Sequence, residues 1–217
     1  MSIRAVVFDM DGLMFNTEEV FHVTATELLA RRGKTATPEV FQSMMGRRAD
    51  EAFANLVRLM ELKDSIDHLK QESSEIFLAS LEEHLAPMPG LWELLHRIES
   101  LGLPKGVATS SDRKYLTYML GRFELLERFD ITLTAEDVTH GKPHPEIYLT
   151  AAKKLNVTPD QMLVLEDSEA GSKAAAAAGA HIISVPHRHS SSHDFTLSKG
   201  VATSLVDPMI LNLLKEG

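Results

Sequence analysis

Seven polar residues of this chain follow short apolar runs. They are Asp9, Asp11, Thr109, Ser110, Lys142, Glu166 and Asp167. Six stand where a strand would give way to a loop, and the seventh, Lys142, lies further along the loop after such a run. Carboxylates brought together repel one another and need a cation, and Mg²⁺ prefers oxygen ligands of this kind. A carboxylate can also attack phosphorus and form an aspartyl-phosphate. The residue types therefore indicate Mg²⁺-assisted phosphoryl transfer, with hydroxyl groups and the lysine holding the phosphate.

Taken singly, each of these residues has an ordinary structural explanation. An aspartate after a strand is more often a turn or helix-cap residue than a catalyst. A lone lysine such as Lys142 is usually solvated. The signal therefore lies in their joint placement, which depends on the elements that carry them.

The apolar runs predict short strands, and the segments between them have helical spacing. The strands are expected at residues 3–8, 104–109, 130–134, 162–165 and 181–185, and the helices at 91–101, 113–126, 145–155, 169–178 and 207–214. Strands that alternate with helices predict a doubly wound parallel α/β sheet. Ligands of such sheets bind beyond the carboxyl ends of the strands, which is where the seven polar residues fall.

The segment from residue 17 to about 85 has a different character. Apolar residues recur there at helical spacing, with breaks near Gly33, Pro38, Gly46 and Asp64 and no convincing strand. The sequence therefore predicts an all-helical cap domain, residues 16–86, inserted after the first strand. Residues 1–15 and 87–217 would form the α/β catalytic core.

Composition limits the classes of partner. The formal net charge of -9 argues against general binding to nucleic acid or to an anionic membrane, although a local site can still be positive. The absence of cysteine excludes disulfides, thiol nucleophiles and thiolate metal sites. With no signal peptide and no apolar stretch long enough to span a bilayer, we expect a soluble, cytoplasmic protein, and a monomer.

Four ordered motifs resemble those of the haloacid-dehalogenase-like superfamily of phosphatases. Asp9-Met10-Asp11-Gly12 resembles the first motif, and Val107-Ala108-Thr109-Ser110-Ser111 resembles the second. Gly141-Lys142-Pro143-His144-Pro145-Glu146 resembles the third, and Leu165-Glu166-Asp167-Ser168 with Ala170-Gly171 resembles the fourth. The match covers nearly the whole chain, and the helical insertion stands where one large subgroup carries its cap.

The resemblance implies a role for each motif residue. Asp9 would be the nucleophile, and Asp11 the general acid that later activates water as a base. Asp9, the backbone carbonyl of Asp11, and Asp167 would hold Mg²⁺. Glu166 would support that metal site. Thr109, Ser110 and Lys142 would hold the phosphate.

Within the superfamily, the chain looks most similar to β-phosphoglucomutase-like proteins and to the pseudouridine-5′-phosphatase type. Phe21 stands where the mutases carry a cap histidine, and Asn16 replaces a common aspartate. Gly46, Arg47 and Arg48 are candidates for substrate contacts from the cap, with a solvated basic turn as the alternative.

The expected activity is hydrolysis of a small phosphorylated metabolite, such as a sugar or nucleoside monophosphate. An intramolecular phosphomutase is the close alternative, and the phenylalanine at position 21 speaks against it. A dehalogenase is a disfavoured alternative, because the departure of a halide does not need Asp11 to protonate a leaving oxygen. A signalling receiver or binding module is a distant alternative, because receivers are shorter and lack the helical insertion. The His- and Ser-rich run at residues 187–193 is expected to be a solvated loop, with metal binding by its histidines as the less favoured alternative.

Overall fold

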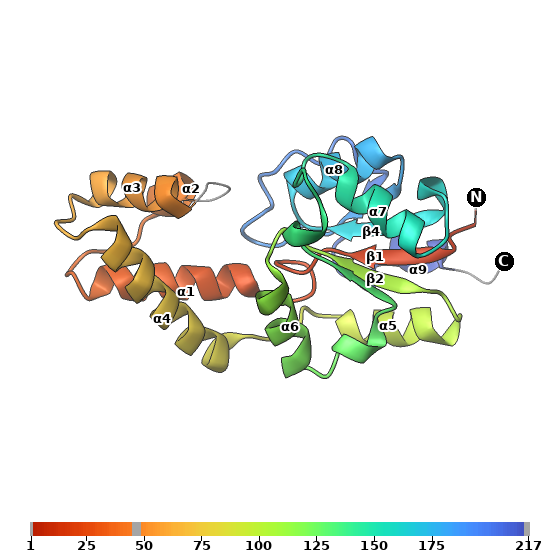
Figure 1. Cartoon of the computed structure of the whole chain (residues 1–217), viewed down its shortest axis with the longest axis horizontal. Coiled ribbons are helices and arrows are strands. Elements are labelled where there is room, and N and C mark those ends of the chain that lie inside the picture. Colours follow the sequence, from red (N-terminus) through yellow and green to blue (C-terminus); the bar gives the residue numbers. More distant parts are fainter. Residues whose placement is uncertain (1, 45–48, 215–217) are drawn as a thin grey trace. The chain divides into compact units, whose positions relative to one another are not determined.

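The computed structural model describes residues 2–44 and 49–214 (Figure 1), and the chain divides into two compact units. The first unit is Met1–Phe15 with Pro87–Gly217, and the second is Asn16–Ala86. The predicted cap residues Gly46, Arg47 and Arg48 lie outside the described residues. No helix in the described ranges is long and apolar enough to cross a membrane.

The first unit is built on a parallel sheet, which in the described chain has six strands in the order β3-β2-β1-β4-β5-β6. The strands are β1 (Ala5–Phe8), β2 (Lys105–Ala108), β3 (Ile131–Leu133), β4 (Met162–Glu166), β5 (His181–Ser184) and β6 (Gly200–Val201). The expected doubly wound sheet is therefore confirmed. The direction of winding reverses between β1 and β4, and this reversal creates a ligand-binding crevice in such folds.

The central strands are buried along their whole length, as expected for a sheet covered on both faces. Every residue of β1 and of β4 is buried. Residues Val7 and Val164 pack on one face with the apolar sides of two helices, and this cluster forms the main described core. These tightly packed strands provide a rigid base for the loops at their carboxyl ends.

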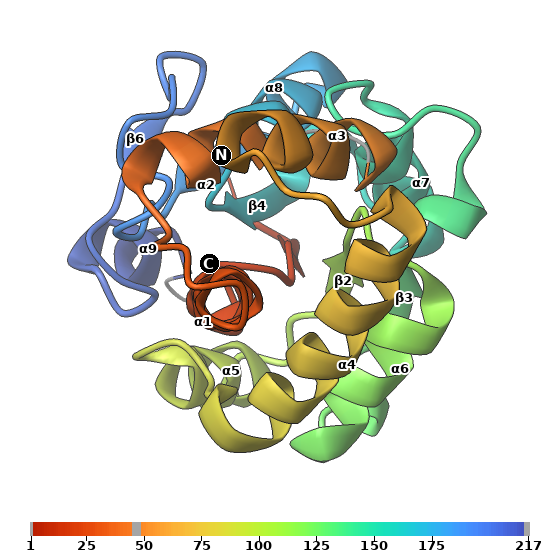
Figure 2. The same cartoon turned by 90° about the vertical axis from the view of Figure 1, so that its left-hand side faces the viewer.

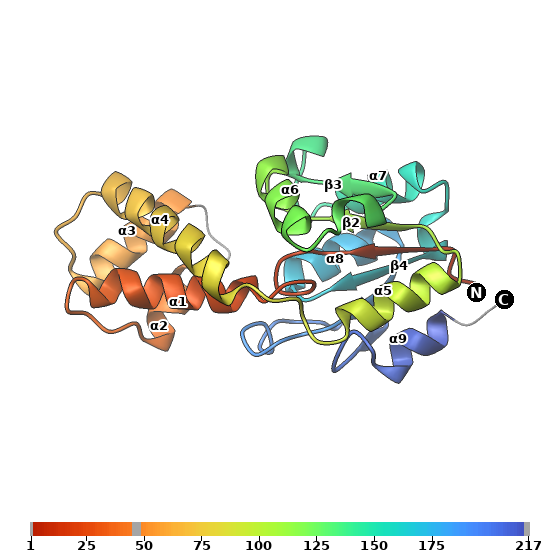
Figure 3. The same cartoon turned by 90° about the horizontal axis from the view of Figure 1, so that it is seen from below.

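Helices cover both faces of this sheet. They are α5 (Leu91–Ser100), α6 (Arg113–Arg122), α7 (Glu146–Lys154), α8 (Glu169–Ala178) and α9 (Pro208–Leu213), with 3-10 turns at Leu126–Arg128, Ala135–Asp137 and Pro159–Gln161. Helices α7 and α8 lie on one face, and Figure 3 shows α5 and α9 on the other.

Two details differ from the expected elements. Helix α6 ends at Arg122 instead of continuing to residue 126, because Glu124 adopts a left-handed backbone conformation with φ of 57°. The short strand β6 was not predicted. It begins at Gly200, where a Cβ atom would lie 2.2 Å from the sulfur of Met209, a flexible and exposed side chain that would have to move.

The second unit is entirely helical in its described part. It contains α1 (Thr17–Ala30), α2 (Pro38–Met44), α3 (Ala49–Met60) and α4 (Ile66–His84). Helix α1 packs against α4, and α2 packs against α3; Figure 2 shows α1 end-on. A small core that includes Leu28, Leu56, Leu69 and Ile76 joins the four helices.

Asn16 ties the two ends of the helical unit together. Its side-chain amide donates to the carbonyl of His84 at 3.0 Å, and its side-chain oxygen accepts from the backbone N–H of Ala86 at 2.7 Å. An aspartate could accept from Ala86 but could not donate to His84. The asparagine therefore fixes the point at which the chain enters and leaves this unit.

Candidate active site

Asp9 is held at the carboxyl end of β1, beside the end of β4. Its backbone N–H donates to the carbonyl of Leu165 at 3.0 Å, and its side chain is almost completely buried. Gly12 follows in a left-handed conformation with φ of 77°, which lets the chain turn sharply after the strand. The sheet thus presents the Asp9 carboxylate at the crevice where the winding reverses.

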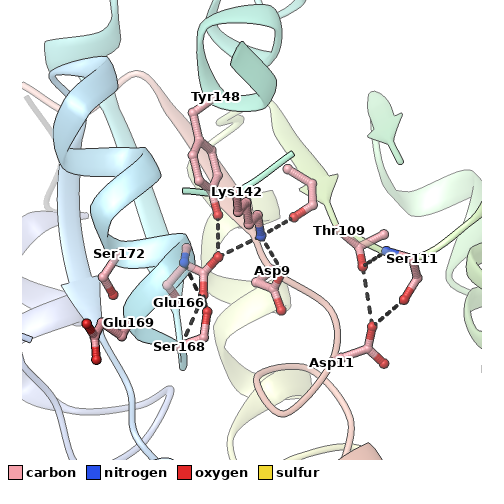
Figure 4. A network of polar contacts seen from close by, with 12 residues as sticks. Asp9, Asp11, Thr109, Ser111, Lys142, Tyr148, Glu166, Ser168, Glu169 and Ser172 are labelled. Carbon is pink, nitrogen blue, oxygen red and sulfur yellow. Dashed lines mark hydrogen bonds and ion pairs between the residues drawn. The ribbon is translucent and has the colours of Figure 1, made fainter. Parts of the chain in front are cut away.

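Lys142 reaches into the crevice from the loop between β3 and α7 (Figure 4). Its ammonium lies 2.5 Å from Oδ1 of Asp9 and 2.6 Å from Oε1 of Glu166, and it donates to the carbonyl of Ala108 at 2.9 Å. The lysine therefore joins the ends of β1, β2 and β4 in one buried, charged contact.

Glu166 is fully buried, and four donors hold its carboxylate. Oε1 accepts from Lys142 and, at 2.7 Å, from the hydroxyl of Tyr148. Oε2 accepts from the hydroxyl of Ser168 at 2.9 Å and from its backbone N–H at 3.2 Å. A Cβ atom on Gly171 would lie only 1.7 Å from Oε1, so the start of α8 needs glycine there to make room for this carboxylate.

The pKa values in this cluster reflect burial and crowded charge. Burial raises the pKa of Asp9 well above its usual range; the Lys142 ammonium acts against this shift, while Glu166 and Asp167 add to it. Burial disfavours the charge on Lys142, but the carboxylates of Asp9 and Glu166 outweigh it and raise the lysine pKa. Burial also raises the pKa of Tyr148, so its phenol keeps the proton that it donates to Glu166.

Asp11 points away from Asp9, toward Thr109 and Ser111 beyond the end of β2 (Figure 4). Its Oδ2 accepts from the hydroxyl of Ser111 at 2.8 Å and from that of Thr109 at 3.3 Å. Its Oδ1 accepts from the hydroxyl of Tyr115 at 3.2 Å. These donors orient the Asp11 carboxylate without neutralising it.

The second motif places its hydroxyls unequally. Thr109 is buried and also accepts from the backbone N–H of Ser111 at 3.0 Å, whereas Ser110 is exposed at the same turn. Ser111 and Tyr115, which were not among the predicted site residues, contact Asp11 directly. Ser111 lies within the motif itself, but no sequence signal marks Tyr115, which reaches Asp11 from the first turn of α6.

Three of the acidic residues could hold a metal ion together. Asp9, Glu166 and Asp167 each offer a carboxylate oxygen within 4.8 Å of the other two, and all three are buried. An all-oxygen set of carboxylates fits Mg²⁺. The carboxylate of Asp11 is not in this group; only its backbone carbonyl was expected to face the metal.

His187 contacts this group and was not predicted as a site residue. Its Nε2 lies 3.0 Å from Oδ2 of Asp167, and its Nδ1 accepts from the backbone N–H of His189 at 3.2 Å. Because Nδ1 is an acceptor, the ring proton is on Nε2 and is donated to Asp167. A Cβ atom on Gly12 would clash with both partners, at 2.4 Å from Asp167 and 2.7 Å from His187. The only sequence signal for this contact was the histidine-rich run.

A buried lysine–carboxylate cluster at the reversal point of a doubly wound sheet is typical of α/β enzymes, and its acidic side chains could hold a cation. The profile of the haloacid dehalogenase-like hydrolase family matches residues 6–185. The chain therefore belongs to this family, as its four motifs indicated.

Comparison with known proteins agrees with this assignment. A phosphorylated carbohydrates phosphatase of Thermotoga maritima is 34% identical over 99% of both chains. A validoxylamine A 7′-phosphate phosphatase of Streptomyces hygroscopicus subsp. limoneus is 34% identical over 86% of this chain and 87% of its own. A crystal structure from Thermotoga maritima, described provisionally as a β-phosphoglucomutase, superposes with a TM-score of 0.83 at 31% identity, covering 99% of this chain and 98% of the other. The chain is an enzyme of the phosphoric monoester hydrolase class.

Proposed function

We propose that this protein is a Mg²⁺-dependent phosphatase that hydrolyses a small phosphorylated metabolite through an aspartyl-phosphate on Asp9. The observation that carries the proposal is the contact of Lys142 with both Asp9 and Glu166 at the reversal point of the sheet. This ammonium can balance the negative charge that accumulates when a carboxylate approaches a phosphate dianion. Asp11, two residues after Asp9, is separately held by hydroxyl groups.

In the first step, a carboxylate oxygen of Asp9 attacks phosphorus and the bond from phosphorus to the leaving oxygen breaks. Asp11 donates its proton to that oxygen, so the product leaves as an alcohol. In the second step, the carboxylate of Asp11 takes a proton from water, and this water attacks phosphorus. The bond between phosphorus and Asp9 then breaks, which releases phosphate and restores both aspartates.

We assign the metal to Asp9 and Asp167, together with the backbone carbonyl of Asp11. Bound there, Mg²⁺ would neutralise charge on the phosphoryl oxygens. Burial raises the pKa of Asp9, and a cation bound there would favour the carboxylate form that the attack requires. Glu166 keeps Lys142 in place, and Thr109 and Ser110 provide hydroxyls for the phosphate.

The names of two relatives support a substrate class. A relative matched over almost its entire length is named for phosphorylated carbohydrates, and another for validoxylamine A 7′-phosphate. We therefore place a sugar phosphate first and a nucleoside monophosphate second. We propose that the helical unit, Asn16–Ala86, acts as the cap that selects among such substrates.

A phosphomutase is the second candidate, because the Thermotoga maritima structure carries that provisional description. Phe21 argues against a phosphomutase. This side chain stacks on Phe77 within the helical unit, with ring centroids 4.6 Å apart, and it offers no proton-transfer group where the mutases carry histidine. A mutase would convert one sugar phosphate into its isomer and depend on a bisphosphate primer, whereas a phosphatase releases free phosphate.

The test is phosphate release from a panel of sugar and nucleoside phosphates in the presence of Mg²⁺. We expect turnover by the native protein and loss of about 10³-fold or more for Asp9→Asn, since the amide is not a nucleophile. Exposed Asp160 provides the matched control, and Asp160→Asn should retain native activity. Native activity in Asp9→Asn, or isomerised sugar phosphate without free phosphate, would overturn the proposal.

A further inference from the structure

A second group of metal-ligating side chains lies on the turn between β3 and α7, outside the acidic cluster. His140, His144 and Glu146 each offer one ligand atom within 4.8 Å of the other two. The imidazole rings of His140 and His144 lie side by side, with centroids 4.6 Å apart. Both histidines are exposed, so an ion could reach them from solvent. The function proposed above makes no use of these three side chains.

The carboxylate of Glu146 is fixed in front of the two rings. Its Oε1 accepts from the backbone N–H of Thr139 at 2.8 Å, and its Oε2 accepts from that of His140 at 3.0 Å. These backbone bonds lower the pKa of Glu146 to about 2, so the group is a carboxylate at neutral pH. A ligand that is already charged and immobilised loses little entropy when an ion binds.

The spacing of the donor atoms suits a small divalent ion. Oε2 of Glu146 lies 3.0 Å from Nδ1 of His140 and 3.8 Å from Nδ1 of His144. Ligands held about 2.0–2.1 Å from a tetrahedral ion are about 3.3–3.4 Å apart, between these two values. Nδ1 of His144 accepts a long 3.3 Å contact from the backbone N–H of Glu146, and an ion bound by this nitrogen would replace that contact.

The donor types separate this group from the acidic cluster. Two imidazole nitrogens and one carboxylate oxygen suit Zn²⁺, Co²⁺ or Ni²⁺, whereas Mg²⁺ prefers the oxygen-only set of Asp9, Glu166 and Asp167. Water can complete the coordination on the open side. The two groups therefore differ in the ions that they would select.

We propose that His140, His144 and Glu146 form a binding site for a divalent transition-metal ion of the Zn²⁺ type. The site would join the first residues of the turn to the start of α7. Lys142 stands in the middle of the same turn, so an ion bound there would restrain the segment that delivers the ammonium to Asp9. Binding to the folded state should also raise the melting temperature of the protein.

Isothermal titration calorimetry with Zn²⁺, in excess Mg²⁺, tests the proposal on the full chain. The native protein should bind one more equivalent of Zn²⁺ than the double variant His140→Ala, His144→Ala. Each single variant should weaken that binding by about tenfold or more, because a three-ligand site becomes a two-ligand site. The matched control is the double variant His68→Ala, His96→Ala, which removes two exposed histidines from other helices. It should bind Zn²⁺ like the native protein.

A measurement on unaltered protein avoids any effect of substitution on folding. Paramagnetic Co²⁺, added in excess Mg²⁺, should broaden the imidazole NMR signals of His140 and His144 first. Equal Zn²⁺ stoichiometry and affinity in native and double-variant protein would overturn the proposal. So would Co²⁺ broadening centred on the histidines of residues 187–193 or on the acidic cluster alone.

Discussion

Nε2 of His187 lies 3.0 Å from Oδ2 of Asp167, and the proton between them belongs to the histidine. The loop that carries His187 is itself fixed, because the hydroxyl of buried Ser190 accepts from the backbone N–H of His187 at 3.1 Å. A hydrogen bond of this kind orients a carboxylate without supplying a full charge. Asp167 is one of the proposed Mg²⁺ ligands, so we expect the contact to influence metal affinity.

Replacing His187 with alanine is expected to weaken Mg²⁺ binding. Loss of a partner that orients a ligand typically costs about 10–100-fold in metal affinity. The dissociation constant for Mg²⁺, measured by calorimetry, should rise by that factor, and activity should recover when Mg²⁺ is raised. His187→Gln, which keeps a donor N–H at similar reach, should restore part of the affinity. Unchanged Mg²⁺ affinity in His187→Ala would show that the contact has no bearing on the metal.

The substitution Gly171→Ala, in helix α8, is expected to lower the catalytic activity. The new Cβ atom would lie 1.7 Å from Oε1 of Glu166, so the carboxylate must move and take Lys142 with it. We expect kcat/KM to fall about 100-fold. The free energy of unfolding should fall by about 1–3 kcal/mol.

Gly121 of α6 provides the matched control for this change. A Cβ atom there meets only Leu126, at 3.6 Å, which is an ordinary contact. Gly121→Ala should keep native activity and should stabilise the protein by up to about 1 kcal/mol, because alanine favours helix. If both variants retained native activity, Glu166 would not position Lys142 in the way described.

Glu99 on α5 is expected to make stability depend on acid pH. It accepts from Nε and a terminal nitrogen of Arg128 at 2.9 and 2.8 Å, and Lys105 lies 3.2 Å away. Hydrogen bonding by Arg128, aided by Lys105, lowers the pKa of Glu99 from 4.5 to about 2. Its stabilising contribution is therefore fully present above pH 4.5 and is lost as the pH falls toward 2.

Denaturant unfolding of native protein and Glu99→Gln at several pH values measures this contribution. At pH 7 the variant should be less stable by about 0.5–1 kcal/mol. The difference should shrink between pH 4.5 and 2, whereas exposed Glu93→Gln on the same helix should differ little from native protein throughout. A difference that stays constant down to pH 2 would rule out the ion pair as its source.

The sheet and the positions of the motif residues could be predicted because both depend on local patterns. Continuous buried runs such as residues 5–8 and 162–166 are typical of parallel strands, and such strands end at one edge. The acids and the lysine that follow them must therefore meet. The roles assigned to those residues remain proposals, and the cap arginines lie outside the described residues.

The contacts that the sequence did not reveal are made by residues whose partners are distant in the chain. Tyr148 stands on the buried face of α7 beside Ile147 and Ala151, so its pattern is that of a core residue. Only the folded chain brings its hydroxyl to Glu166, 18 positions away. His187 reaches Asp167 in the same manner, from a polar run whose composition indicates a solvated loop.

The central claim, that Asp9 carries the phosphoryl group, can be tested with Asp11→Asn. This variant should form the intermediate from p-nitrophenyl phosphate, whose leaving group needs little protonation, but should hydrolyse it slowly. After acid quenching and borohydride reduction, mass spectrometry of the peptide containing residues 5–15 should find homoserine at position 9. Unmodified Asp9 in a variant that still releases one equivalent of p-nitrophenol, or modification at another residue, would contradict the account.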